Sequence, residues 1–151
     1  MSWLNERFAL VERTGLITEA SSGIGSKTAE VFANASAAMV AHGRSVERLG
    51  KLRQRLAIPT YRFTAISVDL VLPSGVEELT QQTLKTHPKI NILVKSAGVA
   101  LTRPVINYDF DQWQRTLDIN LTAPFLLSQA LLARMFDRKW AKLFRYRRKL
   151  L

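Results

Sequence analysis

The sequence predicts an α/β fold, a doubly wound parallel sheet that is incomplete and holds about four to five strands. Two observations carry this prediction. Short apolar segments alternate with longer amphipathic ones along the chain, and a turn of small residues follows the first apolar segment. With 151 residues, of which 47% are hydrophobic and 23% charged, the chain is long enough to bury one core.

The predicted strands are short apolar runs that end in turns: 15–18, 37–43, 62–70 and 91–98. Strands joined by helices at this cadence run parallel through right-handed crossovers, so helices cover both faces of the sheet. Ligands of such sheets bind beyond the carboxyl ends of the strands, where the strand order reverses. The turns after the first, second and fourth strands are therefore the expected functional region.

The predicted helices lie between and after these strands: about 24–35, 45–56, 74–85 and 109–137. Ser74 with Glu77 and Asp109 with Gln112 have the spacing of capping boxes and are expected to begin the last two helices. Pro124 is expected to kink the last helix. The spacing also predicts an apolar face on the first helix: Ile24, Thr28, Val31, Phe32 and Ala35. It predicts an apolar stripe on the last helix: Trp113, Leu117, Leu121, Leu131 and Met135.

The composition excludes several classes of protein. There is no cysteine, which excludes disulfide scaffolds and thiolate zinc sites, and the two histidines, His42 and His87, are too far apart in sequence to indicate a metal site. No apolar stretch approaches the length of a membrane span, and Glu6 and Arg7 stand where a signal peptide needs apolar residues. We therefore expect a cytoplasmic protein with no metal and no membrane partner.

The formal net charge of +10 is concentrated at the end of the chain. Residues 138–151 hold seven of the 22 Lys and Arg and none of the 12 Asp and Glu, so residues 1–137 are only mildly basic. Such a basic tail either binds nucleic acid or anionic lipid, or is simply a solvated terminus. Because no nucleic-acid recognition fold accompanies these charges, a nucleic-acid function is not expected.

The turn between the first strand and the first helix, Thr18–Gly25, reads T-E-A-S-S-G-I-G. Its small residues allow backbone N–H groups to approach a pyrophosphate at the helix N-terminus. With VDL at 68–70, NILVKSAG at 91–98 and LDINLTAPF at 117–125 in register, the chain resembles the short-chain dehydrogenase/reductase family of classical type. The resemblance covers about residues 8–140 and implies a Rossmann-type dinucleotide-binding domain.

The resemblance also implies which residues bind the NAD(P) cofactor: Thr18, Ser21, Ser22, Gly23, Ile24, Gly25, Arg44, Asp69, Ser96, Ala97 and Gly98. Asp69 would accept a hydrogen bond from the adenine amino group, or would serve only as a turn acid at a strand end. Asn120 matches the family's catalytic asparagine, the alternative being a polar residue on a helix flank.

The end of the second strand bears on the choice between NADP and NAD. Family members that prefer NAD place an acid there, whereas this chain has Gly43 followed by Arg44. A guanidinium suits a 2′-phosphate, so NADP is favoured over NAD; the alternative is a solvated arginine at a helix start. The implied substrate is a small alcohol or carbonyl compound.

The cofactor turn and the fourth strand depart from the family pattern. Glu19 replaces the leading glycine of the fingerprint, which strains the turn by about 1–3 kcal/mol if a positive φ is required. Its carboxylate would also repel a phosphate ~5 Å away by roughly 3 kcal/mol at an effective dielectric of about 20. Lys95 and Ser96 replace two asparagines, and Lys95 removes an amide that ties neighbouring strands together. Ser36, where the family has glycine, is a milder change.

The family's catalytic serine and Tyr-x-x-x-Lys motif are not found in these residues. Spacing from Asn120 places the serine near 148–151, where there is none, and Tyr146 and Lys149 are three residues apart instead of four. The segment 139–151 begins like a fifth strand, but its basic residues do not suit a strand buried on both faces. The sequence therefore predicts a C-terminally truncated member of the family.

The expected organisation is a dinucleotide-binding domain at 1–137 followed by a basic tail at 138–151. The expected function is that of an NAD(P)-dependent oxidoreductase of this family, catalytically defective because the serine and Tyr-x-x-x-Lys are missing. The alternative is a non-catalytic nucleotide-binding or subunit-interaction module. The helix at 109–137, which the family uses between subunits, would expose apolar surface and favour homo- or hetero-oligomers.

Overall fold

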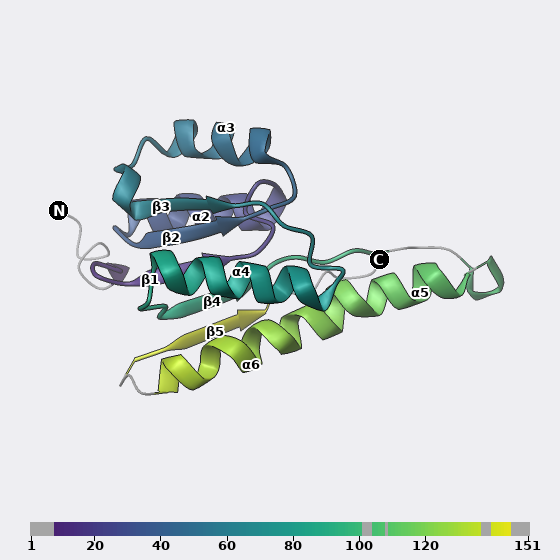
Figure 1. Ribbon diagram of the computed structural model, residues 1–151. Helices are drawn as coiled ribbons and strands as arrows, with labels where there is room; N and C mark the ends of the chain where they lie inside the picture. Colours follow the sequence, from purple (N-terminus) through teal and green to yellow (C-terminus); the bar gives the residue numbers. More distant parts are fainter. Residues whose placement is uncertain (1–7, 101–103, 108, 137–139, 146–151) are drawn as a thin grey trace.

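The computed structural model describes residues 8–100, 104–107, 109–136 and 140–145. Its centre is a parallel sheet of five strands in the order β3-β2-β1-β4-β5 (Figure 1). The strands are β1 (Thr14–Ile17), β2 (Ala38–His42), β3 (Phe63–Ile66), β4 (Ile92–Lys95) and β5 (Lys142–Arg145). The strand order reverses between β1 and β4, so the predicted doubly wound sheet with its switch point is confirmed.

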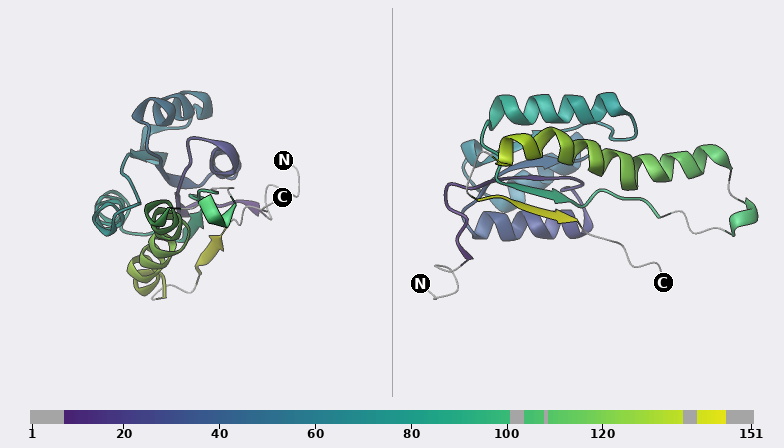
Figure 2. Two further views of the ribbon diagram at one scale, coloured as in Figure 1. Left: turned by 90° about the vertical axis from the view of Figure 1, so that its right-hand side faces the viewer. Right: turned by 90° about the horizontal axis from the view of Figure 1, so that it is seen from below.

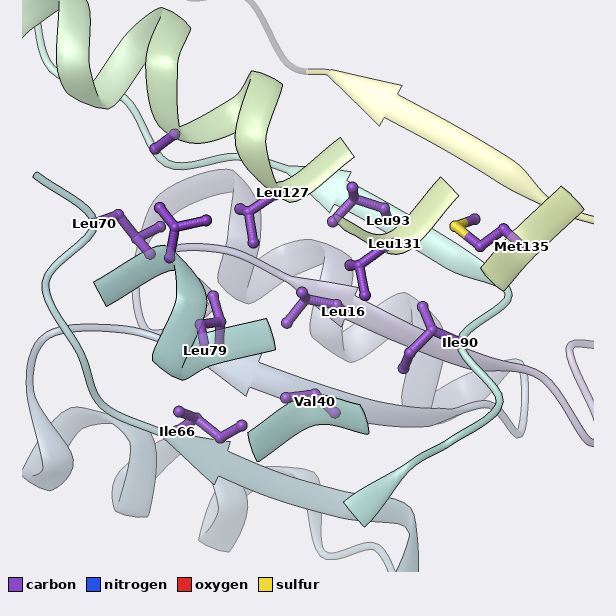
Figure 3. Close-up of a cluster of buried hydrophobic side chains, with 12 residues drawn as sticks. Leu16, Val40, Ile66, Leu70, Leu79, Ile90, Leu93, Leu127, Leu131 and Met135 are labelled. Carbon is purple, nitrogen blue, oxygen red and sulfur yellow. The ribbon is translucent and has the colours of Figure 1, made fainter. Parts of the chain in front are cut away.

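Helices cover both faces of this sheet, as Figure 2 shows. The helices are α2 (Gly23–Asn34), α3 (Val46–Leu56), α4 (Pro73–Thr86), α5 (Phe110–Leu117) and α6 (Ala123–Phe136). Side chains from α4 and α6 join the sheet in one buried cluster, in which Leu16 and Leu93 meet Leu79, Leu127 and Leu131 (Figure 3). A second cluster on the opposite face contains Phe32 of α2 and Leu49 of α3. The close packing of the two cores fixes the positions of the strands. It therefore also fixes the carboxyl ends of the strands, where a ligand would bind.

Helix α4 does not begin at the predicted capping box. Its N-cap is Leu72, Pro73 occupies the first helical turn, and no side chain caps it, so Ser74 already lies within the helix. Proline suits this position because its missing N–H would have no helical acceptor there. The cap predicted for the last helix is confirmed, since the carboxylate of Asp109 accepts the backbone N–H of Gln112 at 2.7 Å.

The buried face of α2 also differs from the prediction. Ile24 and Val31 are 42% and 58% exposed, and the buried residues are Gly25, Ala29 and Phe32. This face is displaced by about one residue, which is roughly 100° around a helix. Glycine is required at position 25 of this face because a Cβ there would lie 2.2 Å from the carbonyl oxygen of Glu19.

The predicted apolar stripe of the last helix is wrong in its first half. Trp113 and Leu121 are 52% and 57% exposed, whereas Leu131 and Met135 are buried as predicted. A π-helical turn at Asp118–Thr122 separates α5 from α6. Such a turn inserts about one extra residue and rotates everything beyond it, so one continuous periodicity does not fit both halves. The irregularity lies just before Pro124, where the sequence predicts a kink.

The helical stretch Phe110–Phe136 is 27 residues long and, by length and composition alone, apolar enough to cross a membrane. Length and composition alone do not make this helix a membrane span, so the expectation of no membrane partner is not overturned. A helix whose apolar residues fill a core passes the same test, and Leu127, Leu131 and Met135 lie in the core cluster under α4.

Part of the predicted basic tail belongs to the sheet. Residues Lys142–Arg145 form β5, parallel to β4, with Lys95 in register with Arg145. All four residues of β5 are exposed. The objection that basic residues do not suit a fifth strand assumed burial on both faces; in the described part of the chain β5 is an edge strand, which tolerates charge.

Candidate functional site

The carboxyl ends of β1 to β4 bring together the turns that the sequence singles out. The N–H of Ala20 donates to the carbonyl of His42 at 2.7 Å, and the N–H of Gly43 donates to the carbonyl of Ile66 at 3.2 Å. The N–H of Thr18 donates to the carbonyl of Val94 at 3.0 Å. These hydrogen bonds therefore join the four turns along one edge of the sheet. This edge lies beside the switch point, where parallel sheets bind ligands.

The first turn adopts a left-handed conformation at Glu19, with φ of +54°. The leading position of the fingerprint thus does require a positive φ, as the sequence analysis considered, and a non-glycine residue there costs about 1–2 kcal/mol. The N–H of Glu19 lies 3.4 Å from Nδ1 of His42. Ser36 likewise has a positive φ, +66°, although it lies away from this edge, before β2.

The two glycines of the turn have different roles. Gly23 has φ of +50°, is exposed, and has open space where a Cβ would stand. Gly25 is buried and lets the start of α2 approach the carbonyl of Glu19. Ser22 is the N-cap of α2, yet its side chain makes no capping hydrogen bond, so no side chain there competes for the first N–H groups. The turn suits the approach of a phosphate to the helix N-terminus.

His42 is a site residue that the sequence analysis missed. The ring is buried at the end of β2; Nδ1 accepts from Glu19, so Nε2 carries the hydrogen and donates to the carbonyl of Val68 at 3.1 Å. Burial lowers the pKa of His42, which keeps the ring neutral. The imidazole therefore connects the turns after β1 and β3. Only its polarity at the end of an apolar strand could have indicated this role.

Arg44 and Asp69 lie exposed at the ends of β2 and β3. The carbonyl of Arg44 accepts the Ser67 hydroxyl at 3.1 Å, which leaves its guanidinium uninvolved in that contact. A Cβ on Gly43 would lie 2.8 Å from Oγ of Ser21, so a side chain at this end of β2 would require Ser21 to move. One oxygen of Asp69 accepts the N–H of Val71 at 3.1 Å, which is the turn-acid role named as the alternative.

Thr18 is buried and its hydroxyl is fully used within the protein. Oγ1 accepts the N–H groups of Ser96 and Ala97, each at 2.9 Å, and donates to the carbonyl of Val94 at 3.4 Å. The turn after β4 is thus tied to β1 although Lys95 lacks the family's amide. Thr18 is one of the predicted cofactor residues, but its side chain is buried. There it positions the turn after β4.

Asn120 lies in the π-helical turn and faces the segment after β4. Its Nδ2 donates to the carbonyl of Val99 at 2.7 Å, and its Oδ1 accepts the N–H of Val99 at 3.1 Å. A Cβ on Gly98 would lie 2.9 Å from Oδ1, so glycine permits this approach. Asn120 therefore does more than flank a helix as a polar residue, because its side-chain amide makes two hydrogen bonds with the backbone of Val99.

Two cations lie at the ends of β4 and β5, and one of them, Arg145, contacts Asn120. Nζ of Lys95 donates to Oγ of Ser128 at 2.9 Å, and Arg145 donates from Nη2 to the carbonyl of Asn120 at 2.9 Å. Burial, and then the charge of Arg145, lower the pKa of Lys95. Tyr146 and Lys149, which the sequence analysis set aside as a catalytic pair, lie outside the described residues.

Comparison with known proteins identifies the family. A family model described as short chain dehydrogenase matches residues 13–144. An uncharacterized oxidoreductase of Staphylococcus epidermidis is 30% identical over 128 residues, which are 79% of this chain and 54% of that protein. The NAD-dependent glycerol dehydrogenase of Listeria innocua is 31% identical over 124 residues, which are 82% of this chain and 48% of that protein.

A solved structure agrees with this assignment. The 3-oxoacyl (acyl-carrier-protein) reductase of Agrobacterium tumefaciens with NADP bound superimposes with a TM-score of 0.87 and 26% identity, over 94% of this chain and 55% of that one. The chain belongs to the short-chain dehydrogenase/reductase family, and the resemblance drawn from its motifs is confirmed. It spans about half the length of the relatives it matches.

Proposed function

We propose that this chain is the dinucleotide-binding part of an NAD(P)-dependent oxidoreductase, that it favours NADP, and that these 151 residues alone turn over no alcohol or carbonyl substrate. The observation that carries the proposal is the glycine turn at the carboxyl edge, with Gly23 open and Gly25 closely packed. Dinucleotides bind at such turns beside a switch point. The bound cofactor would supply the hydride acceptor or donor; the residues described below would hold it.

The proposed cofactor site runs along the ends of β1, β2 and β3. The N-terminal N–H groups of α2 would face the pyrophosphate, and the Arg44 guanidinium would pair with a 2′-phosphate. The carboxylate of Asp69, one oxygen of which accepts the N–H of Val71, is the candidate acceptor for the adenine amino group. Glu19 is the feature that opposes binding, because its carboxylate belongs to the same turn and repels phosphate.

The proposed lack of turnover rests on the proton donor. The candidate asparagine, Asn120, donates to the carbonyl of Val99 in the segment after β4. The serine and Tyr-x-x-x-Lys that the family uses with it are not found among the 151 residues. Asn120 has no proton to give at neutral pH, so these residues provide cofactor binding without general acid catalysis.

Fluorescence titration with NADPH and NADH tests the proposal. We expect tighter binding of NADPH, and Arg44→Ala should weaken NADPH about tenfold while changing NADH little, because only NADPH carries the 2′-phosphate. Arg48→Ala is the matched control, an exposed arginine of the following helix. Equal affinities for both nucleotides, or equal losses in the two variants, would contradict the preference for NADP. Steady oxidation or reduction of small alcohols and ketones by the purified chain would refute the proposed inactivity.

A second candidate function is association through α5 and α6. Five large apolar side chains on these helices and the turn between them are exposed: Phe110, Trp113, Leu121, Phe125 and Phe136. Such a surface favours contact with another subunit. Light scattering on the purified chain and on Phe125→Ser separates the two cases: a concentration-dependent mass that the substitution lowers supports association, and a monomer in both forms excludes it.

A further inference from the structure

The cation pair at the ends of β4 and β5, Lys95 and Arg145, lies on the far side of the switch point from the glycine turn. The two residues are register partners in adjacent parallel strands, so their side chains leave the same face of the sheet. Their positive charges are held by neutral oxygens, Lys95 by the Ser128 hydroxyl and Arg145 by the Asn120 carbonyl. Among the described residues, the three ion pairs involve neither of them.

The backbone explains why these cations are fixed in place. Pro124 has no N–H to give to the carbonyl of Asn120 four residues earlier, and Arg145 supplies a donor to that oxygen. The carbonyl of Pro124 accepts the Ser128 hydroxyl at 2.6 Å, and this orients the oxygen of Ser128 toward Lys95. Each contact uses one donor, so within the described part of the chain two of the three N–H groups of Lys95 and four of the five of Arg145 have no hydrogen-bond acceptor.

The two cations come from paired positions of adjacent strands, and burial of Lys95, followed by the charge of Arg145, opposes the charged form of Lys95. An oxyanion between them would favour that charged form and would use the remaining donors. We infer that Lys95 and Arg145 form an oxyanion site at the carboxyl edge of β4 and β5, which takes the carboxylate or phosphate group of an acidic small molecule.

The inference deepens the proposed function and rests on it in one respect, that the acidic molecule is the alcohol or carbonyl substrate. Asn120 borders the site, so a carboxylate bound there would place a neighbouring hydroxyl or carbonyl carbon close to the turn after β4. The substrate class would then be acidic hydroxy or keto compounds. The oxyanion site itself needs no dinucleotide and is measured without one.

Nuclear magnetic resonance on the full chain, at constant ionic strength set with chloride, tests the site. The probes are lactate, inorganic phosphate and propan-2-ol, which matches lactate except for a methyl group in place of the carboxylate. We expect saturable shifts of the Lys95 and Arg145 side-chain signals with an oxyanion and none with propan-2-ol. Saturation by lactate alone assigns a carboxylate site, and saturation by phosphate alone assigns a phosphate site. Linear shifts with both, or shifts of equal size with propan-2-ol, overturn the inference.

Substitutions locate the binding. Lys95→Met keeps the stem and removes the charge, and Arg145→Gln does the same on an exposed strand where unfolding is not expected. Each should weaken oxyanion binding at least tenfold, whereas Lys51→Met, a lysine in an exposed helical ion pair, should not. Unchanged affinity in both site variants contradicts the inference. In the unsubstituted protein a saturating oxyanion should also raise the pKa of Lys95, and an unmoved pKa is a second contrary result. Phosphate shifts at Gly23 and Gly25 that persist in Lys95→Met would report the glycine turn instead.

The two proposals fail separately. If the chain binds oxyanions but not NADPH, the proposed cofactor function is wrong and the oxyanion site stands alone. NADPH binding without oxyanion binding removes only the inference made here.

Discussion

The two halves of the carboxyl edge of the sheet, the turns after β1 to β3 and the ends of β4 and β5, differ in how their residues are packed. At the ends of β1, β2 and β3 the small residues are retained, and hydrogen bonds among the turns link the strand ends. At the ends of β4 and β5, Lys95 stands where the family pattern has an asparagine, Arg145 is its register partner, and β5 is exposed along its length. The first half is determined by close packing of backbone, which tolerates little change. In the second, β5 with Arg145 is exposed, so side chains there can change without loss of the fold.

The largest effect should follow from filling the close contact under the first turn. Gly25→Ala places a Cβ against the carbonyl of Glu19, so we expect the free energy of unfolding to fall by about 3 kcal/mol. Gly50→Ala is the control, since Gly50 lies in α3 with open space around its Cβ position and alanine should stabilise the helix by up to about 1 kcal/mol. Urea unfolding of both variants measures the difference; a loss below 1 kcal/mol for Gly25→Ala would mean that the turn is not tightly packed.

The connection between the two halves should be the next most sensitive feature. Thr18→Val leaves the N–H groups of Ser96 and Ala97 without their acceptor, which should cost about 2 kcal/mol. Thr28→Val removes a hydroxyl that bonds only to the carbonyl of Ile24 in its own helix, and should cost less than about 0.5 kcal/mol. Equal losses in the two variants, measured by urea unfolding, would show that Thr18 does not join the halves.

Acid should weaken the first half through His42. Its pKa is lowered in the folded chain from an ordinary value of 6.5, so the unfolded chain binds the proton more readily. Stability is therefore fully present above pH 6.5 and falls as the pH drops below it, by about 1.4 kcal/mol per pH unit for each such histidine. Burial lowers the pKa of His87 in the same direction. The free energy of unfolding, plotted against pH between 5 and 7, should have a slope that is smaller by about one proton in His42→Gln than in the unsubstituted chain. If the slope instead disappears wholly in His87→Gln, the pH dependence comes from His87 and not from His42.

The smallest effect should be on the exposed half. Arg145→Gln removes one hydrogen bond on an exposed strand and should change the free energy of unfolding by less than about 0.5 kcal/mol. Arg62→Gln is its counterpart beside β3, where the half-buried guanidinium donates to the carbonyls of Ala33 and Ala37, and it should cost about 2 kcal/mol. If Arg145→Gln costs as much as Arg62→Gln in the same urea experiment, the two halves do not differ in the way described.

The sequence predicted features that depend on neighbouring residues, and it missed features that depend on contacts between distant segments. The strand, turn and helix at 14–34 and the cap at Asp109 depend on local residue types and spacing, and they were predictable. His42 was missed because its partners, Glu19 and Val68, come from turns more than twenty residues away on either side. The exposed side of Trp113 was missed because the π-helical turn changes the phase of the helix, and that turn arises from packing as much as from sequence. Strand β5 belongs to the sheet because it pairs with β4. The many basic residues of this segment gave no sign of that pairing.

The most direct test of the central claim is the affinity of NADPH for Glu19→Gly. Glycine relieves the strained φ and removes the carboxylate, so NADPH should bind about a hundredfold more tightly than to the unsubstituted chain. Ser36→Gly relieves a positive φ elsewhere and should leave the affinity unchanged. If neither the unsubstituted chain nor Glu19→Gly binds NADPH, or if both variants tighten binding equally, the glycine turn is not a dinucleotide site.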